Sequence, residues 1–149
     1  VHESLYSYEN LSEVEMDSYI RNLVQHSKGG EGNIRFTLDL DEVRFDIAKA
    51  VPCGIVVNEL IMNALTHAFP QEEGGQIEVA LKRKGDDSVE LSVIDTGCGL
   101  PEGFSFEKSS TLGANLIRVL VQQIDAKLWY FTNRESGQGT VVRVEIPVE

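Results

Sequence analysis

The chain has few cysteines, few histidines and no long apolar run. Its two cysteines, Cys53 and Cys98, form no CxxC pair and stand in no cluster with histidine. Buried free thiols are therefore favoured over a disulfide or a zinc site. The three histidines, His2, His26 and His67, have no metal-ligand spacing. No apolar stretch approaches the roughly 18 residues of a membrane span, and no signal peptide opens the chain. We expect a cytoplasmic location, with a membrane anchor elsewhere in a longer protein left open.

Positive charge is also scarce. Lysine and arginine number 13 against 24 acidic residues, which gives a formal net charge of −11. This balance argues against a nucleic-acid partner, because phosphate contacts need clustered basic side chains. An anionic ligand would instead need a metal ion or backbone amides to offset the local repulsion. Two common nucleotide loops, GxxxxGK[ST] and a strand–GxGxxG–helix unit, are absent.

The 149 residues are enough for one domain with a substantial core. Hydrophobic periodicity and turn signals predict an ordered series of elements. They are a helix from a capping box at Ser12–Glu15 to about His26, a turn over 28–33, a strand over 34–40, a helix from Pro52 to about Phe69, strands 76–84 and 88–94, a loop over 95–107, a helix over 111–124, and strands 127–132 and 140–147. The segment 41–48 is ambiguous. The order favours an α+β fold, a two-layer sandwich with a mixed, mostly antiparallel sheet covered by three helices.

A polar stripe marks the central predicted helix. Glu59, Asn63 and His67 stand four residues apart and share one face of an otherwise apolar helix. Carboxylate and amide oxygens are hard ligands that Mg²⁺ accepts directly or through its waters. A metal or a polar ligand would explain the stripe, and so would a half-buried helix with one polar edge.

Three glycine-containing turns could also meet a ligand. Asp95 ends a predicted strand before Gly97 and Gly99, where a carboxylate could accept a hydrogen bond from an exocyclic amine, or could simply start a turn. The segment 111–113, Thr-Leu-Gly, opens a helix whose amides could bind an anion. The segment 137–140, Gly-Gln-Gly-Thr, could be no more than a hairpin turn.

Taken together and in order, NELIMNALTHAFP, DTGCGLP, TLGANLIRVL and GQGT resemble the N, G1, G2 and G3 boxes of the GHKL ATP-binding superfamily. The likeness is to the catalytic and ATP-binding domain of sensor histidine kinases, in the branch whose N box reads NELxxNAxxHAFP. It implies a Bergerat fold over residues 11–149. It also implies that residues 1–10 are the end of an upstream dimerisation-hairpin helix.

The resemblance implies catalytic and metal-binding roles on the central helix. Asn63 would coordinate the Mg²⁺ that bridges the ATP phosphates. Glu59 holds the superfamily's acidic position and would support the metal or orient the nucleophile. His67 would be the basic group on that face, because Thr66 stands where related kinases often carry lysine.

The resemblance also implies how ATP would be bound elsewhere. Asp95 would accept from the adenine amine. Gly97 and Gly99 would shape the adenine floor, and Gly139 and Thr140 would close the adenine side. Gly113 would admit the phosphates at the start of the helix over 111–124, where Leu112 would also belong to the nucleotide site.

The function implied is transfer of the ATP γ-phosphoryl group to a histidine on a separate dimerisation and phosphoacceptor domain, and onward to the receiver domain of a response regulator. The fragment is expected to be a monomer and the complete protein a homodimer. Two rivals stay open: a GHKL ATPase or anti-sigma-factor-type serine kinase, and a silent module that keeps the fold for nucleotide or protein binding.

Overall fold

The computed structural model describes residues 13–27, 34–68, 74–97, 99–100, 103–132 and 139–148, with only the backbone of His67 and Ala68. The predicted helix end at 1–10 and the turn at 28–33 lie outside these ranges. Five strands form the main sheet in the order β2-β4-β5-β7-β6. Their bounds are Ile34–Leu40 for β2, Gly75–Lys84 for β4, Ser88–Asp95 for β5, Lys127–Thr132 for β6 and Thr140–Pro147 for β7.

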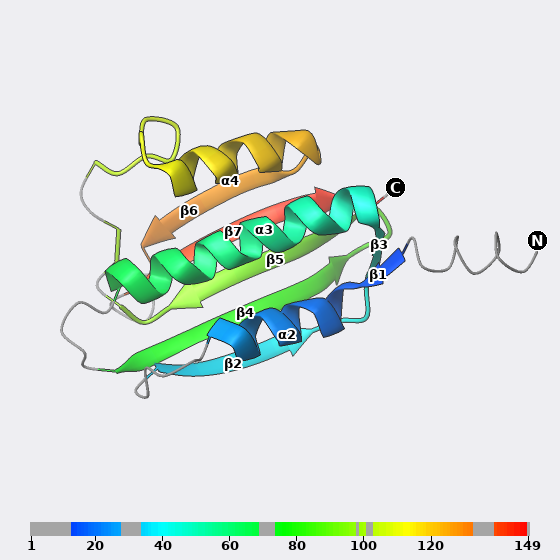
Figure 1. Ribbon diagram of the computed structural model, residues 1–149, viewed down its shortest axis with the longest axis horizontal. Coiled ribbons are helices and arrows are strands. Elements are labelled where there is room, and N and C mark those ends of the chain that lie inside the picture. Colours follow the sequence, from blue (N-terminus) through cyan, green and yellow to red (C-terminus); the bar gives the residue numbers. More distant parts are fainter. Residues whose placement is uncertain are drawn as a thin grey trace, which may run out of the picture.

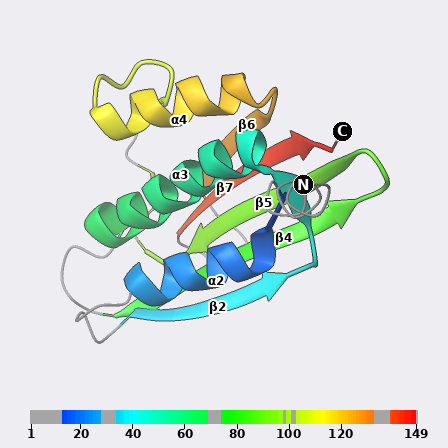
Figure 2. The same ribbon diagram turned by 45° about the vertical axis from the view of Figure 1, so that its right-hand side comes forward.

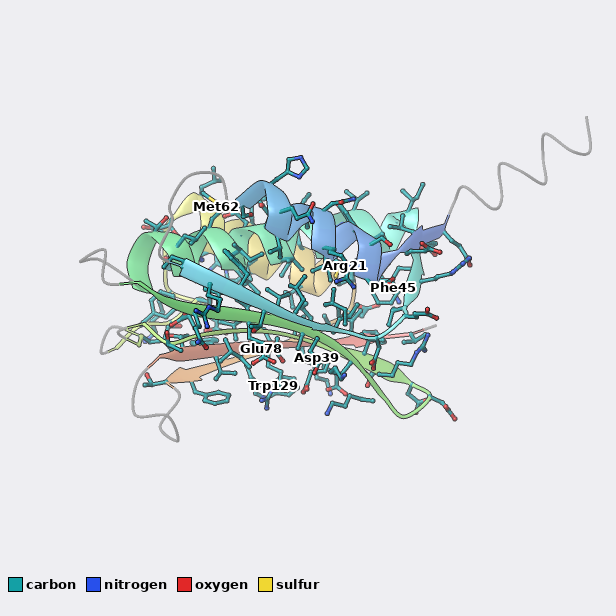
Figure 3. The ribbon with its side chains drawn as sticks, turned by 90° about the horizontal axis from the view of Figure 1, so that it is seen from below. Arg21, Asp39, Phe45, Met62, Glu78 and Trp129 are labelled. Carbon is teal, nitrogen blue, oxygen red and sulfur yellow. The ribbon has the colours of Figure 1, made fainter. Side chains whose placement is uncertain are left out.

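Three helices cover one face of this sheet (Figures 1 and 2). They are α2 (Met16–Ser27), α3 (Ile47–Asn63), which continues as the π-helical turn η1 (Ala64–Ala68), and α4 (Leu112–Gln123). The other face carries Asp39, Glu78 and Trp129, which point away from the helices (Figure 3). Strand β2 pairs with β4 in parallel, and the other three pairings are antiparallel. The predicted α+β sandwich with three helices on a mixed sheet is therefore confirmed.

Helix α3 is the centre of the core, because apolar residues occur on most of its circumference. Val56, Val57 and Ile61 are at most 1% exposed and pack with the inward side chains of the sheet. Among the described residues, one helix, Ile47–Thr66, is long and apolar enough to cross a membrane by length and composition, with a mean hydropathy of 1.3. The sequence reading missed this run. The core helix of a globular domain passes the same test, and half of this window is buried inside the fold.

The first helix begins later than the capping box predicts. Glu13–Glu15 forms a short strand, β1, which pairs antiparallel with β3 (Arg44–Asp46). Helix α2 then starts at Met16, whose backbone N–H donates to the carbonyl of Val43 at 2.8 Å. The prediction was wrong because a backbone carbonyl on another segment satisfies the helix's first donor, a long-range contact that a local motif does not encode.

Helix α3 begins five residues before Pro52, so the predicted first-turn proline lies inside the helix. Asp46 is the N-cap, and its side chain accepts from the backbone N–H of Lys49 at 3.0 Å. The ambiguous segment 41–48 thus contains β3 and the start of α3. The helix tolerates Pro52 although a proline at this depth removes one helical hydrogen bond.

The N-cap gives a first prediction. Asp46→Ala is expected to lower the free energy of unfolding by about 1 kcal/mol, because it leaves a donor of the first turn without its side-chain partner. Asp46→Asn keeps an acceptor oxygen at the same place and is expected to remain close to wild type. Urea denaturation of the three proteins measures both effects. Equal stability of Asp46→Ala and wild type would contradict this account of the helix start.

Candidate functional site

The polar stripe of α3 faces the start of α4. Glu59 and Asn63 are half-buried, while Leu60 and Ala64, the residues that directly follow them in the chain, are buried in the core. A Cβ atom placed on Gly113 would lie 2.8 Å from Oε1 of Glu59 and 3.8 Å from Oδ1 of Asn63. The first turn of α4 therefore lies against both oxygens. Any side chain at position 113 would displace the Glu59 carboxylate.

Thr111 fixes where α4 begins. It is the N-cap of the helix, and its hydroxyl accepts from the backbone N–H of Ala114 at 3.2 Å. The remaining free amides of the first turn give this end of α4 its partial positive charge. The two α3 oxygens and the amide-bearing helix start together form one polar corner.

Asp95 forms the second polar position, at the end of β5. The residue is only 6% exposed. Its Oδ1 accepts from the backbone N–H of Gly97 at 2.9 Å and from that of Thr140 at 3.2 Å. Burial raises the pKa of the Asp95 carboxyl, while these two N–H bonds act in the opposite direction. Both bonds engage the same oxygen, so Oδ2 can accept from a ligand.

Close backbone packing holds Asp95 in place. Gly139 has a φ of +110°, and a Cβ atom there would lie 2.0 Å from the carbonyl oxygen of Asp95. Gly99 has a φ of +84° and approaches Thr132, with 3.2 Å between its added Cβ and the Thr132 Cγ2. These glycines allow the two loops to meet around the end of β5. At position 139, the second glycine of the GQGT motif, the close contact with Asp95 therefore requires glycine.

One cavity of about 400 Å³ connects the two polar positions. Asn63 lies on its α3 wall and Asp95 on its sheet wall. Its volume is typical of a small-molecule site, and such sites are mostly apolar with a few placed polar groups. The other residues that line it are Leu60, Ala64, Val93, Gly99, Leu100, Phe104, Phe106, Thr111, Thr140 and Val142.

The site residues predicted from the sequence fall into groups. Four line the cavity: Asn63, Asp95, Gly99 and Thr140. Four adjoin these: Glu59 and Gly113 beside Asn63, and Gly97 and Gly139 at Asp95. Two stand apart: the Leu112 side chain is 76% exposed to solvent, so only its backbone could contribute, and the His67 side chain lies outside the described residues.

Sequence reasoning missed the aromatic wall of the cavity. Phe104 and Phe106 line it, and both pack edge-to-face on Tyr130 of β6 with centroid distances of 5.9 Å and 4.7 Å. The sequence signal that could have indicated this wall was the presence of two closely spaced phenylalanines in a loop otherwise rich in glycine and polar residues. Tyr130 had no such signal, because strand alternation predicts it only as one inward-facing residue among several.

Cys53 can be excluded from the chemistry of the site. It is fully buried, and burial raises the pKa of its thiol to about 12. A thiol in this state is not a nucleophile. The predicted buried free thiol is confirmed for Cys53, while Cys98 lies outside the described residues.

The donor set suits a Mg²⁺ ion carried by a phosphate ligand. Over the part of the chain that the structure describes, no group of three or more His, Cys, Asp or Glu side chains could hold a metal. Magnesium, however, is commonly held by one or two protein oxygens together with substrate phosphates and water. Glu59 and Asn63 supply such oxygens, and the space that a Cβ at Gly113 would fill lies beside both of them.

Comparisons with known proteins identify the family. Residues 48–149 match the family described as histidine kinase-, DNA gyrase B-, and HSP90-like ATPase. Blue-light-activated histidine kinase 2 of Erythrobacter litoralis is 30% identical over 80% of this chain and 34% of its own length. Sensor histidine kinase PdtaS of Mycobacterium tuberculosis is 37% identical over 68% of this chain and 20% of its own length. The solved histidine kinase domain of E. litoralis EL346 superposes with a TM-score of 0.82 and 26% identity, covering 90% of this chain and 61% of that one.

The chain therefore belongs to the histidine kinase-, DNA gyrase B- and HSP90-like ATPase family, and its fold is that of histidine kinase catalytic domains. The chain spans about a third of the length of the Erythrobacter relative and a fifth of the length of the Mycobacterium relative. Membership of an ATP-using family confirms the resemblance seen in the sequence. The activity and partners of the whole protein remain proposals.

Proposed function

We propose that this chain binds Mg²⁺-ATP in the cavity and donates the γ-phosphoryl group to a histidine on a separate phosphoacceptor domain, in two-component signalling. The observation that carries the proposal is that Asn63 and Asp95, from different elements, line one cavity of nucleotide size. The names of the two curated relatives described above, a blue-light-activated histidine kinase and a sensor histidine kinase, favour a kinase over the other activities in the family.

Each of the two polar positions would bind a different part of ATP. Asp95 Oδ2 would accept from the adenine amine, while the backbone N–H groups of Gly97 and Thr140 hold the carboxylate in place. Leu60, Ala64 and Val93 provide an apolar wall for the base. This arrangement selects a flat heterocycle with a donor at its edge.

The opposite corner suits the phosphates. Bound Mg²⁺ would neutralise charge on the transferring phosphoryl group, and Glu59 and Asn63 are the residues that would hold it. The amides at the start of α4 would receive phosphate oxygens, and Gly113 keeps that approach free of a side chain. Phosphoryl transfer depends mainly on positioning and charge stabilisation, which these groups supply without a nucleophile of their own.

The acceptor and later steps are inferred from chemistry. Among the described residues no histidine lines the cavity, so the histidine acceptor would come from a dimerisation and phosphoacceptor domain. From there the phosphoryl group would pass to an aspartate on a response-regulator receiver domain. The complete protein is expected to be a cytoplasmic or membrane-anchored homodimer.

A phosphotransfer assay on the complete protein tests the proposal. Labelled ATP is expected to yield an acid-labile, alkali-stable phosphoprotein, and Asn63→Ala is expected to reduce the rate on the order of 100-fold through loss of a metal ligand. Asn22→Ala removes the same amide from an exposed position on α2 and serves as the control. ATP hydrolysis without phosphoprotein would instead identify an ATPase. Full activity of Asn63→Ala would contradict the proposed metal corner.

A further inference from the structure

The segment Gly103–Thr111 forms one side of the cavity and is folded on itself. The backbone N–H groups of Lys108 and Ser109 donate to the carbonyl of Ser105 at 3.2 Å and 3.0 Å. The Ser105 hydroxyl donates to Oε1 of Glu107 at 2.9 Å and accepts from the backbone N–H of Glu107 at 3.1 Å. Local bonds therefore give this segment its shape, but they do not attach it to the rest of the domain.

The attachment comes from Tyr130 of β6. Its hydroxyl donates to Oε1 of Glu107 at 2.6 Å and accepts from the backbone N–H of Phe106 at 3.2 Å. Its ring packs edge-to-face on Phe104 and Phe106, which also contact each other at 5.0 Å between centroids. One oxygen on a strand of the main sheet thus makes two hydrogen bonds to the segment.

A second attachment comes from α4. Arg118 donates to the backbone carbonyl of Glu107 at 2.5 Å and to the side-chain oxygen of Asn115. The bonds from Tyr130 and Ser105 lower the pKa of Glu107, so its carboxylate stays ionised at neutral pH. A hydrogen bond to an ionised acceptor is stronger than one between neutral groups. Glu107 is consequently held from the sheet through its side chain and from α4 through its backbone.

We infer that Tyr130 is a positioning residue for the nucleotide: its hydroxyl, through Glu107 and Phe106, holds the aromatic wall closed against the bound base. The inference rests on the proposed function. Phe106 is 3% exposed and lines the cavity, so the position of its backbone determines how closely the wall approaches a ligand. When the two bonds break, the segment keeps its internal turn but can swing away from β6, and nucleotide leaves faster.

Tyr130→Phe isolates this role because it removes one oxygen and keeps the ring contacts. Amide hydrogen exchange in 104–110 is expected to accelerate roughly three- to tenfold without nucleotide, which corresponds to one or two modest hydrogen bonds. The dissociation rate of ATP with Mg²⁺ is expected to rise by a similar factor, with little change in thermal stability. Tyr19→Phe removes a hydroxyl from a partly buried tyrosine on α2 and is the matched control.

A double-mutant cycle separates positioning from simple packing. Glu107→Ala is expected to reproduce the faster ATP dissociation, and the double variant to fall short of the sum of the two single effects, because both variants remove the bond between Tyr130 and Glu107. Independent, additive effects would overturn the inference, as would unchanged exchange or an unchanged dissociation rate in Tyr130→Phe. If the wild-type chain bound no ATP, the proposed function would fail first. If the wild type bound ATP and Tyr130→Phe behaved identically, only the inference would fail.

Discussion

In Asp95→Asn, ATP affinity is expected to fall on the order of 100-fold while the fold persists. The amide oxygen can still accept from the backbone N–H groups of Gly97 and Thr140, so the loop geometry is retained. The amide nitrogen then stands where the second carboxylate oxygen was and presents donors to the donating amine of adenine. Two buried donors that face each other without an acceptor cost about 1–3 kcal/mol. A site that is built for one hydrogen bond therefore binds its ligand much more weakly when that bond cannot form.

The control for this variant is Asp86→Asn, which removes the same charge at the exposed β4–β5 turn. Removing a negative charge from a chain of net charge −11 should, if anything, favour an anionic ligand. A loss of affinity confined to Asp95→Asn therefore cannot come from long-range electrostatics. Equilibrium dialysis with ATP and Mg²⁺ measures both variants, and unchanged affinity in Asp95→Asn would remove the adenine assignment.

The stability of the same variant has a defined pH dependence. Because burial raises the pKa of Asp95, the folded state holds the carboxyl proton more tightly than the unfolded chain does. The stability linked to this proton is complete below the ordinary carboxyl pKa and is lost as pH rises through the raised value. Asp95→Asn has no such loss. At neutral pH, the free energy of unfolding of Asp95→Asn is expected to be at least that of the wild type. In acid, the difference between the two proteins is expected to be smaller, and urea denaturation at both pH values measures it.

Gly139→Ala is expected to give the largest loss of stability, roughly 3 kcal/mol or more. The added Cβ would lie 2.0 Å from the carbonyl oxygen of Asp95 and 3.0 Å from its carbonyl carbon, and both are backbone atoms that cannot rotate away. The φ of +110° adds conformational strain for any residue with a side chain. The loop before β7 would have to separate from the end of β5.

Gly103→Ala provides the comparison. Gly103 also has a positive φ, +80°, but an added Cβ meets nothing within 4 Å. The Gly103→Ala variant should lose only the contribution of conformational strain, about 1 kcal/mol in the free energy of unfolding. Thermal and urea unfolding of the two variants separate the cost of backbone strain, which both share, from the cost of steric overlap, which only Gly139→Ala has. If Gly139→Ala were no less stable than Gly103→Ala, the close approach of the two loops would be incorrect.

Much of the fold could be predicted because local patterns and long-range pairing agree. The strands Lys127–Thr132 and Thr140–Pro147 were predicted with the bounds that the structure shows. The errors came where distant backbone decided the outcome. Glu13–Glu15 became a strand by pairing with Arg44–Asp46, and Asp46 started α3 although Pro52 offered the stronger local signal.

The site was predicted where its residues occur in motifs, and missed where it depends on packing. A polar residue on an apolar helix or at a strand end needs a partner, which made Asn63 and Asp95 candidates but left a polar helix edge and a simple turn open. Their binding roles came from the resemblance to the GHKL boxes. That they line one cavity followed only from the structure. Tyr130 was not predictable, since its role depends on which loop lies above β6, a relation that strand periodicity does not contain.

The central claim is that one cavity receives adenine at Asp95 and the metal with its phosphates at Glu59 and Asn63. Amide and side-chain NMR spectra of the chain, titrated with ATP and then with Mn²⁺ in place of Mg²⁺, test it most directly. ATP is expected to shift Gly97 and Thr140 together with Gly113, and Mn²⁺ to broaden Asn63 and Gly113 much more than Gly97. Shifts confined to one end, or broadening centred away from α3, would contradict the account.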